Sequence, residues 1–410
     1  MADSIDKSAV PAKRKPSRRY SGRRDAIIAS AVAVINRKGV RGMTLADVAE
    51  RLDLVPTGVI YYFKNKEELA VACFERAIDR FNGLIAEAAA ADGARARVES
   101  FIDGFIDYKR RSALGQAERI AVFNDVRALN NPGLNAAYVD MFRRARALFP
   151  SAAFSRPEQN ARTHLLLSQA FWAVVWLPRF DPEDYPRAAS RTADILMNGL
   201  AAPGARWPSV SLPDLAPATE GDPSAELFLR AATELINEQG YLGASVEKIS
   251  ARLNVTKGAF YHRHDAKDDL VLACFERTFQ VVRQAIRTAE ASASNGYERL
   301  AAAASALVEY QISGNAPLLR TSALTSVPEP LQEELVRKFD RLSDRLAGII
   351  CDGVADGSVR PVEVNVAAQL ITAMINAAAE LKYWAPGVVP QNAAALYVRP
   401  LFEGLLTPKA

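Results

Sequence analysis

The chain contains one stretch of sequence twice. Residues 24–76 align without gaps onto residues 225–277, a shift of 201 positions, and fourteen of the 53 aligned positions are identical. Both copies end in the run Cys-Phe-Glu-Arg, at residues 73–76 and 274–277. Because a repeat of about 200 residues is as long as an ordinary domain, we expect two complete folding units in tandem.

The boundary between the two units is predicted at residues 202–223. This stretch holds five prolines and two glycines, which interrupt helices and supply little apolar surface. Together with the repeat it predicts six segments along the chain. These are a basic arm at 1–22, helical domains at 23–70 and 71–201, the linker at 202–223, and helical domains at 224–271 and 272–410.

The composition favours a cytoplasmic protein without a cofactor. Of the 410 residues, 49% are hydrophobic, but no uninterrupted apolar run reaches the ~18 residues of a membrane helix. The first residues also lack the apolar core of a signal peptide. Cys73, Cys274 and Cys351 form no Cys-x-x-Cys pair, which argues against a disulfide framework or a zinc site. We therefore expect no bound metal and no cofactor.

The first 24 residues are strongly basic. They carry eight lysines and arginines against two aspartates, whereas the whole chain has a formal net charge of only +4. Prolines and serines interrupt these charges without apolar periodicity, so we expect residues 1–22 to be a disordered arm. Such clusters attract phosphate backbones. A solvated tail that only aids solubility is the alternative interpretation.

Each repeated segment is predicted to contain short helices around tight turns. Apolar residues recur at helical spacing from Ile27 to Ile35, and the pattern stops at Gly39, a residue suited to positive φ beyond a helix end. Thr44 and its counterpart Ser245 are typical N-caps for a second helix. The first two helices of a compact helical domain are therefore expected in both copies.

A tight turn and two further helices are predicted after the second helix. Asp53 and Asn254 tolerate positive φ and suit the turn. The third helix, at 56–62 and 257–263, combines small, aromatic and basic residues in place of an apolar stripe, so we expect it to be exposed. A fourth helix is expected to begin at Asn65, with Glu68 completing a capping-box-like pair.

Both copies resemble the DNA-binding domain of the TetR (tetracycline-repressor) family. The first copy reads IASAVAVINRKGVRGMTLADVAERLDLVPTGVIYYFKNKEEL and the second reads LRAATELINEQGYLGASVEKISARLNVTKGAFYHRHDAKDDL. The most specific parts are Gly39-x-x-Gly42-x-Thr44 and residues 61–69, with residues 255–261 in the second copy. The resemblance implies an all-α fold, in which each unit has a three-helix, helix–turn–helix DNA-binding domain followed by a helical effector and dimerisation bundle.

The resemblance also assigns residues that contact DNA. It places hydroxyl, aromatic and basic side chains beside the phosphate backbone, namely Thr44, Tyr61, Lys66, Ser245, His262 and Lys267. Tyr62, Lys64 and Tyr261 are counted among the DNA-binding residues as well. The residues placed against base edges in the major groove are Val55, Pro56, Thr57, Gly58, Thr256, Lys257, Gly258 and Ala259. Among these, Lys257 is the candidate for a hydrogen bond to guanine.

The two reading segments depart from the family pattern in different ways. The first copy has Val55 where the family usually has a Ser or Thr cap, and Thr57 where Gly is common. The second copy has His264 where the first has Phe63. Replacing a buried ring with histidine loses about 1–3 kcal/mol of apolar burial, so the second domain is expected to be looser or to bind DNA differently.

The regions after the repeats are predicted to be strings of helices. The predicted helices are 93–112, 117–129, 134–148, 158–179 and 184–200 in the first unit, and 296–312, 316–326, 330–352, 362–385 and 391–405 in the second. The stretches 165–177 and 366–381 are apolar over most of their circumference, as expected of helices buried in a bundle. In the family this region binds an effector and supplies two long helices for dimerisation.

A largely apolar small-molecule effector is expected among these helices, with one pocket in each unit. The candidate lining residues are Tyr108, Phe123, His164, Trp172 and Trp176 in the first unit and Tyr310, Tyr383 and Trp384 in the second. For any one of them, a side chain that only fills the core is the competing interpretation.

The implied function is that of a regulator, not of an enzyme. The sequence carries no Walker loop, nucleotide-binding glycine motif, nucleophile elbow or zinc-protease motif. We expect a repressor that an effector releases from double-stranded DNA, with residues 158–200 and 362–405 pairing into an internal pseudo-dimer on unlike half-sites. A homodimer of tandem chains is one alternative. A TetR-like protein that senses an effector or partner through degenerate DNA-binding domains is another.

Overall fold

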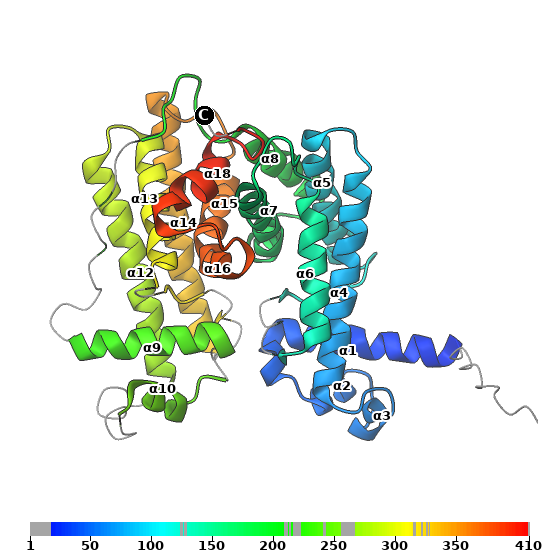
Figure 1. Cartoon of the computed structure of the whole chain (residues 1–410). Helices are drawn as coiled ribbons and strands as arrows, with labels where there is room; N and C mark the ends of the chain where they lie inside the picture. The colour runs from blue at the N-terminus through cyan, green and yellow to red at the C-terminus, as the bar shows by residue number, and fades with distance from the viewer. Residues whose placement is uncertain are drawn as a thin grey trace, which may run out of the picture.

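The computed structural model confirms an all-α chain built from two tandem units. It describes residues 18–123, 126, 129–208, 212, 215, 223–240, 243–255, 267–314, 317–320, 323, 324, 327 and 329–408. Within these residues every regular element is a helix, apart from one isolated bridge between Ala201 and Val359. Each unit has a small domain at one end of the molecule, and the larger helices of both units meet at the other end (Figure 1).

The first unit follows the helix order expected from the sequence. Its helices are α1 (Arg18–Gly42), α2 (Leu45–Glu50), α3 (Pro56–Ile60), α4 (Lys66–Ala89), α5 (Ala94–Ala113), α6 (Pro132–Arg146), α7 (Arg156–Trp176) and α8 (Tyr185–Asn198), with short 3₁₀ turns at Leu177–Arg179 and Pro182–Asp184. Because α1 begins at Arg18, residues 18–22 are helical, and the predicted disordered arm is too long at this end.

The second unit has the same order, with a broken C-terminal helix. Its described helices are α9 (Pro223–Gln239), α10 (Val246–Leu253), α12 (Lys267–Ser292), α13 (Gly296–Ile312), α14 (Glu329–Asp356), α15 (Val364–Ala377), α16 (Leu381–Trp384), α17 (Pro390–Ala393) and α18 (Arg399–Glu403). A 3₁₀ turn at Ala378–Glu380 follows α15, and a π-helical turn, η7 (Ala394–Val398), precedes α18.

The helix predicted at 117–129 is wrong, and so is its counterpart at 316–326 over the residues described there. An asparagine of the repeat holds each segment in an irregular conformation. The Asn36 amide donates to the Ile120 carbonyl (2.9 Å) and accepts from the Val122 amide (3.0 Å). In the second unit the Asn237 amide donates to the Leu318 carbonyl (2.9 Å) and accepts from the Arg320 amide (3.0 Å). These contacts use backbone groups that a helix would have to pair internally.

The described start of the predicted linker packs on the second unit. The Ala202 amide donates to the Ser358 carbonyl (3.1 Å), next to the bridge from Ala201 to Val359. The Trp207 ring lies edge-on to Phe402, with centroids 5.7 Å apart. Residues 202–207 therefore attach the end of the first unit to the second, and are not a free spacer.

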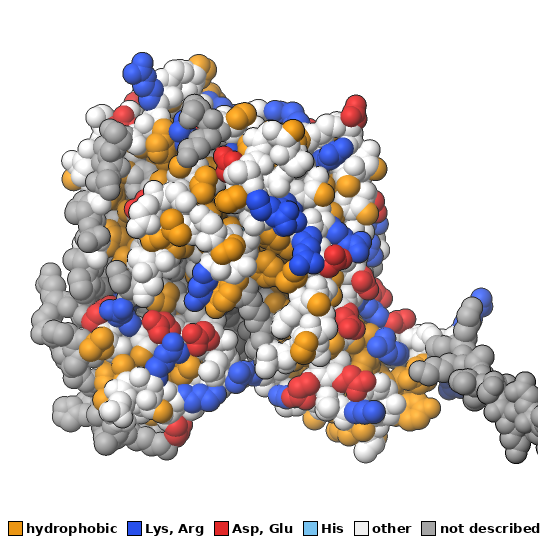
Figure 2. All heavy atoms as spheres, in the orientation of Figure 1, with side chains coloured by type: hydrophobic (Ala, Val, Ile, Leu, Met, Phe, Trp, Pro, Cys, Tyr) orange, Lys and Arg blue, Asp and Glu red, His pale blue; other side chains and the backbone are white. Residues whose placement is uncertain are grey.

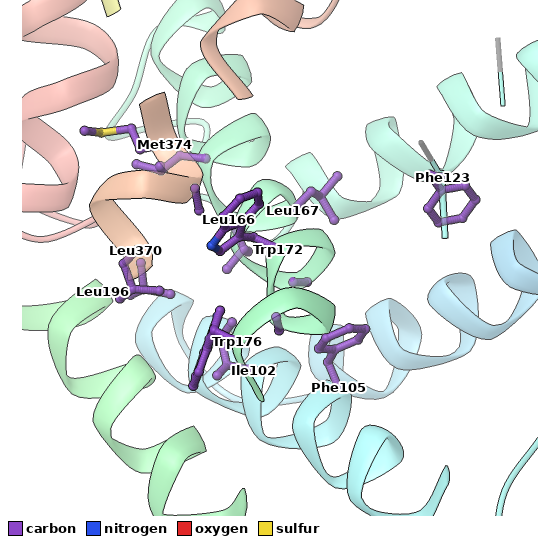
Figure 3. Packing of buried hydrophobic residues seen from close by; sticks show 14 of the residues in the cluster. Ile102, Phe105, Phe123, Leu166, Leu167, Trp172, Trp176, Leu196, Leu370 and Met374 are labelled. Atoms are coloured by element: carbon purple, nitrogen blue, oxygen red, sulfur yellow. The ribbon is translucent and has the colours of Figure 1, made fainter. Parts of the chain in front are cut away.

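The two units pack against each other through their last helices. Helices α7 and α8 contact α15, and α7 also contacts η7. Figure 3 shows Leu166 and Trp172 of α7 beside Leu370 and Met374 of α15. Hydrogen bonds cross this interface, since the Trp172 indole donates to the Gln369 side chain (3.0 Å) and the Gln169 amide donates to the Leu370 carbonyl (3.3 Å).

The C-terminal ends of the two units also bind each other reciprocally. The Leu200 amide donates to the Phe402 carbonyl (2.7 Å), and the Leu405 amide donates to the Leu196 carbonyl (2.8 Å). Gly199 and Gly404, at matching places in the two units, have φ of 68° and 105° and let the two chain segments approach closely.

An arginine from each unit holds the end of the other. Arg162 of α7 is buried and donates to the Leu405 and Thr407 carbonyls (both 3.0 Å). Arg360 of the second unit donates to the Gly199 carbonyl (2.8 Å) and pairs with Asp194 (3.0 Å). The crossing of the two ends is therefore anchored from both sides by charge-assisted hydrogen bonds.

One helical stretch, Val364–Trp384, is long and apolar enough to cross a membrane by composition alone. It comprises α15, the following 3₁₀ turn and α16. Here 61% of its most apolar window is buried inside the protein, where α15 packs on α7 and α14. Its hydrophobicity is that of a bundle-core helix.

Candidate nucleic-acid interface and central cavity

The first repeated segment forms a compact helix–turn–helix. Thr44 caps α2 by accepting from the Asp47 amide (3.1 Å), and Asp53 adopts a φ of 52° in the turn before α3, as the sequence predicts. Val59 and Phe63 are buried and attach α3 to the domain. The Arg24 guanidinium lies 4.9 Å from the centre of the Phe63 ring. These contacts fix the orientation of the short helix.

The outer face of α3 is exposed and largely apolar. Val55 is 65% exposed, Pro56 and Thr57 are exposed beside it, and Ile60 also faces solvent. Sequence reasoning missed Ile60, which could contact a thymine methyl group. Gly58 was predicted to face base edges, but a side chain at this position would point toward Leu54. Gly58 therefore faces its own domain more than the outside.

Aromatic side chains form a cluster at the end of α3. Tyr61 is 73% exposed, and its ring lies edge-on to Tyr62, with centroids 5.1 Å apart. Tyr20, near the start of α1, joins the cluster at 4.8 Å from Tyr62, a contact that the sequence analysis did not anticipate. The first residues of α1 thus lie beside the predicted backbone-contacting tyrosines.

The predicted polar contacts of the first copy are all at the surface or close to it. Lys64 is exposed, and the Lys66 ammonium donates to the Arg41 carbonyl (3.2 Å), which leaves two of its N–H groups for a phosphate. The backbone amide and hydroxyl of Thr44 both donate to the Asp47 carboxylate (3.1 and 2.8 Å). Thr44 is therefore engaged in the cap in this structure.

The second copy differs at the start of its second helix. Ser245 accepts from the Lys248 amide (3.3 Å), and Asn254 has a φ of 54°, as expected for the turn. Lys248 occupies the position of Asp47, so a cation replaces the carboxylate near the helix start. Lys267 is described, and burial lowers the pKa of its ammonium.

The remaining predicted contacts of the second copy lie outside the described residues. They are Thr256, Lys257, Gly258, Ala259, Tyr261 and His262, together with His264.

The two small domains lie at the same end of the molecule. In Figure 1, α2 and α3 of the first unit and α10 of the second lie on one side, opposite the chain's C-terminal end. Figure 2 shows a notch between their lower parts. The two domains approach each other where Arg41 of the first packs against Gly243 of the second.

A cavity of about 900 Å³ lies between the two units. Five of the predicted effector residues line it, namely Phe123, His164, Trp172, Tyr383 and Trp384. The two predicted pockets therefore meet in one shared space. The His164 ring also forms a hydrogen bond in the core, because its Nδ1 lies 3.2 Å from the Tyr397 hydroxyl.

Equivalent residues of both repeats reach the same cavity. Ile35, Asn36 and Gly39 line it from α1. Ile236, Asn237 and Gly240, at the same repeat positions, line it from the end of α9. The first helix of each repeat therefore borders the cavity.

Three predicted effector residues do not line this cavity. The Tyr108 hydroxyl donates to the Glu118 carbonyl, and the Tyr310 hydroxyl accepts from Arg277 (2.7 Å). Trp176 is buried with its ring edge-on to Phe180. Each of these rings fills space within its own unit, which is the competing interpretation that the sequence allowed.

Each described carboxylate that lines the cavity is paired with an arginine. Asp340 pairs with Arg179, and Glu380 pairs with Arg320 (2.5 Å). Glu234 and Glu238 both pair with Arg252 (2.9 and 3.0 Å). The acidic charge around the cavity is thus neutralised within the protein.

Comparison with known families finds both copies of the repeat. The tetR family of bacterial regulatory proteins matches residues 27–73 and again 228–274. A tetracyclin repressor-like C-terminal domain matches residues 293–380. The transposon Tn10 TetC protein of Escherichia coli is 32% identical over 92 residues, which are 22% of this chain and 46% of that protein. The chain thus spans about half the length of this curated relative.

Solved structures of similar proteins include three regulators. PfmR, a TetR family transcriptional regulator from Thermus thermophilus, is 21% identical with a TM-score of 0.35, over 43% of this chain and 98% of its own. KstR2, a ketosteroid transcriptional regulator of Mycobacterium tuberculosis, is 16% identical with a TM-score of 0.37, over 46% of this chain and 96% of its own. FadR from Bacillus subtilis, solved in complex with stearoyl-CoA, is 19% identical with a TM-score of 0.35, over 43% of this chain and 97% of its own.

Proposed function

Because the chain belongs to the TetR family and carries two family units in tandem, we propose that it is a repressor that binds DNA as a single-chain pseudo-dimer. A small-molecule effector bound between the units releases it from its operator. Its partners are double-stranded DNA and that effector, and its place of action is the cytoplasm.

The observation that carries this proposal is the reciprocal joining of the two units. A twofold pairing needs equivalent surfaces, and the duplicated units supply them within one molecule. The crossed ends at Gly199 and Gly404 and the contact of α7 with α15 are contacts of this kind. The described helices of the two DNA-binding domains, α2 and α3 in the first unit and α10 in the second, then lie on the same side of the molecule, as two half-sites on one duplex require.

The cavity supports a role for an effector in DNA release. Residues of α1 and of the end of α9 form part of its wall, so an occupant next to them would contact both DNA-binding domains. An effector needs only a different affinity for two domain spacings to shift the equilibrium between bound and released states. Couplings of about 1–3 kcal/mol are typical of such linkage.

The proposal is tested by substitutions in the two DNA-binding domains. Tyr61→Ala combined with Lys66→Ala should weaken binding to all sequences alike and reduce the salt slope by about one, because these residues contact phosphates. Lys257→Ala should cost about 1–3 kcal/mol and relax the preference at one half-site only. Both effects are measured by titrating labelled duplexes, after the operator has been selected from random DNA.

The control is Arg191→Ala on α8, which removes one exposed positive charge from the C-terminal region of the first unit. Unchanged DNA binding by this variant would show that the losses are local. If the purified chain selects no DNA from the random pool, the proposed function is wrong. A uniform loss from Lys257→Ala would remove that residue from the base-reading set.

The asparagine clamps connect each DNA-binding domain to its C-terminal region. Asn36→Ala removes both hydrogen bonds to the segment at 120–122 and leaves a partly buried carbonyl and amide unpaired. A loss of about 1–3 kcal/mol is expected locally, which should speed amide hydrogen exchange in this segment about tenfold or more. Asn237→Ala should act in the same way on residues 318–320. Substitution of the exposed Asn135 should change neither segment, and equal exchange in all three variants would contradict the clamp.

A further inference from the structure

The central cavity has unpaired positive charge on the wall formed by the first unit. Lys109 of α5 lines the cavity, and no described residue forms a hydrogen bond or an ion pair with its ammonium. Arg119, in the segment after α5, lines the same wall, and its guanidinium likewise has no described partner. Every described cavity carboxylate is already paired with an arginine, so none of these carboxylates neutralises Lys109, which is half-buried, or Arg119, which is exposed.

The second unit does not repeat this arrangement. Lys109 directly follows Tyr108, and the residue that directly follows Tyr310 in α13 is Gln311. The Gln311 side chain donates to the Ile375 carbonyl and accepts from the Leu318 amide, both at 3.0 Å. One unit therefore uses this position to hold its own backbone, while the other places there a lysine that has no partner among the described residues. A lysine at this position occurs once per chain.

The same cavity also has aromatic rings in its wall, and both units supply them. Phe123 lies edge-on to Phe171 of α7, with centroids 5.3 Å apart. Trp384 of α16 lies 4.9 Å from Tyr138 and is stacked on Phe142 at 5.0 Å. Such rings favour an apolar or aromatic body in the ligand.

We propose that the cavity binds one amphipathic anion per chain, with its acidic head group on Lys109 and Arg119 and its apolar body along Phe123, Phe171 and Trp384. This inference names the chemical class of the effector, and it rests on the proposed function. An isolated cation beside an apolar cavity is costly, whereas a charge-assisted contact with an anion stabilises it. Burial lowers the pKa of Lys109, and the nearby Arg119 charge lowers it further, so an anion would relieve both effects.

Two dyes with similar bodies test the proposal without DNA. One is 8-anilinonaphthalene-1-sulfonate, which carries an acidic group, and the other is N-phenyl-1-naphthylamine, which is neutral. Fluorescence titration should find one sulfonate site per chain. Lys109→Met should lower the affinity for the sulfonate dye about tenfold or more, because the charged contact is lost. It should lower the affinity for the neutral dye no more than about twofold.

Lys382→Met is the matched control, because this exposed lysine lines the same cavity from the second unit. It should leave both dyes within about twofold of the wild-type affinity. Displacement of the dye by decanoate or by decyl phosphate then distinguishes a carboxylate head group from a phosphate. Lys109→Met should melt no earlier than the wild type, because a half-buried cation is removed and no described partner is left unpaired.

Three results would overturn the proposal. The first is no saturable binding of the sulfonate dye, and the second is two equivalent sites per chain. The third is an equal loss of affinity for both dyes in a Lys109→Met variant that melts like the wild type. None of these results touches DNA selection, so they would leave the proposed regulator function standing.

Discussion

An Arg277→Met variant should lose about 3–5 kcal/mol of unfolding free energy, because it leaves a buried carboxylate without its ion-pair partner. The Arg277 side chain is 1% exposed, and its guanidinium donates to Glu226 of α9 at 2.9 Å. It also donates to the Pro317 carbonyl (3.2 Å) and the Tyr310 hydroxyl (2.7 Å). Urea unfolding followed by far-ultraviolet circular dichroism measures the loss.

The matched control is the same residue of the first repeat. Arg76 also ends a Cys-Phe-Glu-Arg run and pairs with Asp25, the counterpart of Glu226, but Asp25 is 52% exposed. Arg76→Met should therefore cost no more than about 1 kcal/mol. The double variant Glu226→Leu with Arg277→Met should recover most of the loss, because it leaves no unpaired charge. Equal losses at Arg76 and Arg277 would contradict the difference in burial.

The second large effect is expected at Gly404, where the two units cross. An alanine there must adopt a φ of 105°, which costs about 1–3 kcal/mol. Its Cβ would also lie 2.5 Å from the Met197 carbonyl oxygen of the first unit, and such overpacking costs about 1–3 kcal/mol more. Gly404→Ala should therefore destabilise the chain by about 2–6 kcal/mol in urea unfolding, followed by tryptophan fluorescence.

Gly314 separates the two contributions at Gly404. It has a φ of 77°, but an added Cβ would meet no atom within 4 Å. Gly314→Ala should cost roughly 1–2 kcal/mol from its backbone conformation alone. A loss at Gly404 no larger than the loss at Gly314 would mean that the crossing of the two ends does not hold the units together.

Local sequence signals predicted the small domains well because short-range contacts determine them. Thr44, Ser245 and Asn65 cap the helices that they were expected to cap, and Asp53 and Asn254 adopt positive φ in the turns. Each of these features depends on a few neighbouring residues, so the residue type alone carries the information.

Long-range contacts account for the predictions that failed. Residues 117–129 have helical periodicity, but Asn36, more than 80 residues earlier, takes the backbone groups that a helix needs. Tyr108 and Phe123 were equally plausible cavity residues by type, and only Phe123 lines the cavity. The shared cavity was missed as well, because it arises where the two units meet. The sequence of one repeat does not predict how the two units pack against each other.

The central claim is that one chain does what two chains do in ordinary family members. Sedimentation of the chain with its selected operator duplex measures the number of chains per duplex directly. The account predicts one chain of 44.6 kDa per duplex, a free protein of the same mass, and unlike half-sites about one helical turn apart. Two chains per duplex on a perfectly palindromic site, with a free protein of twice the chain mass, would contradict it.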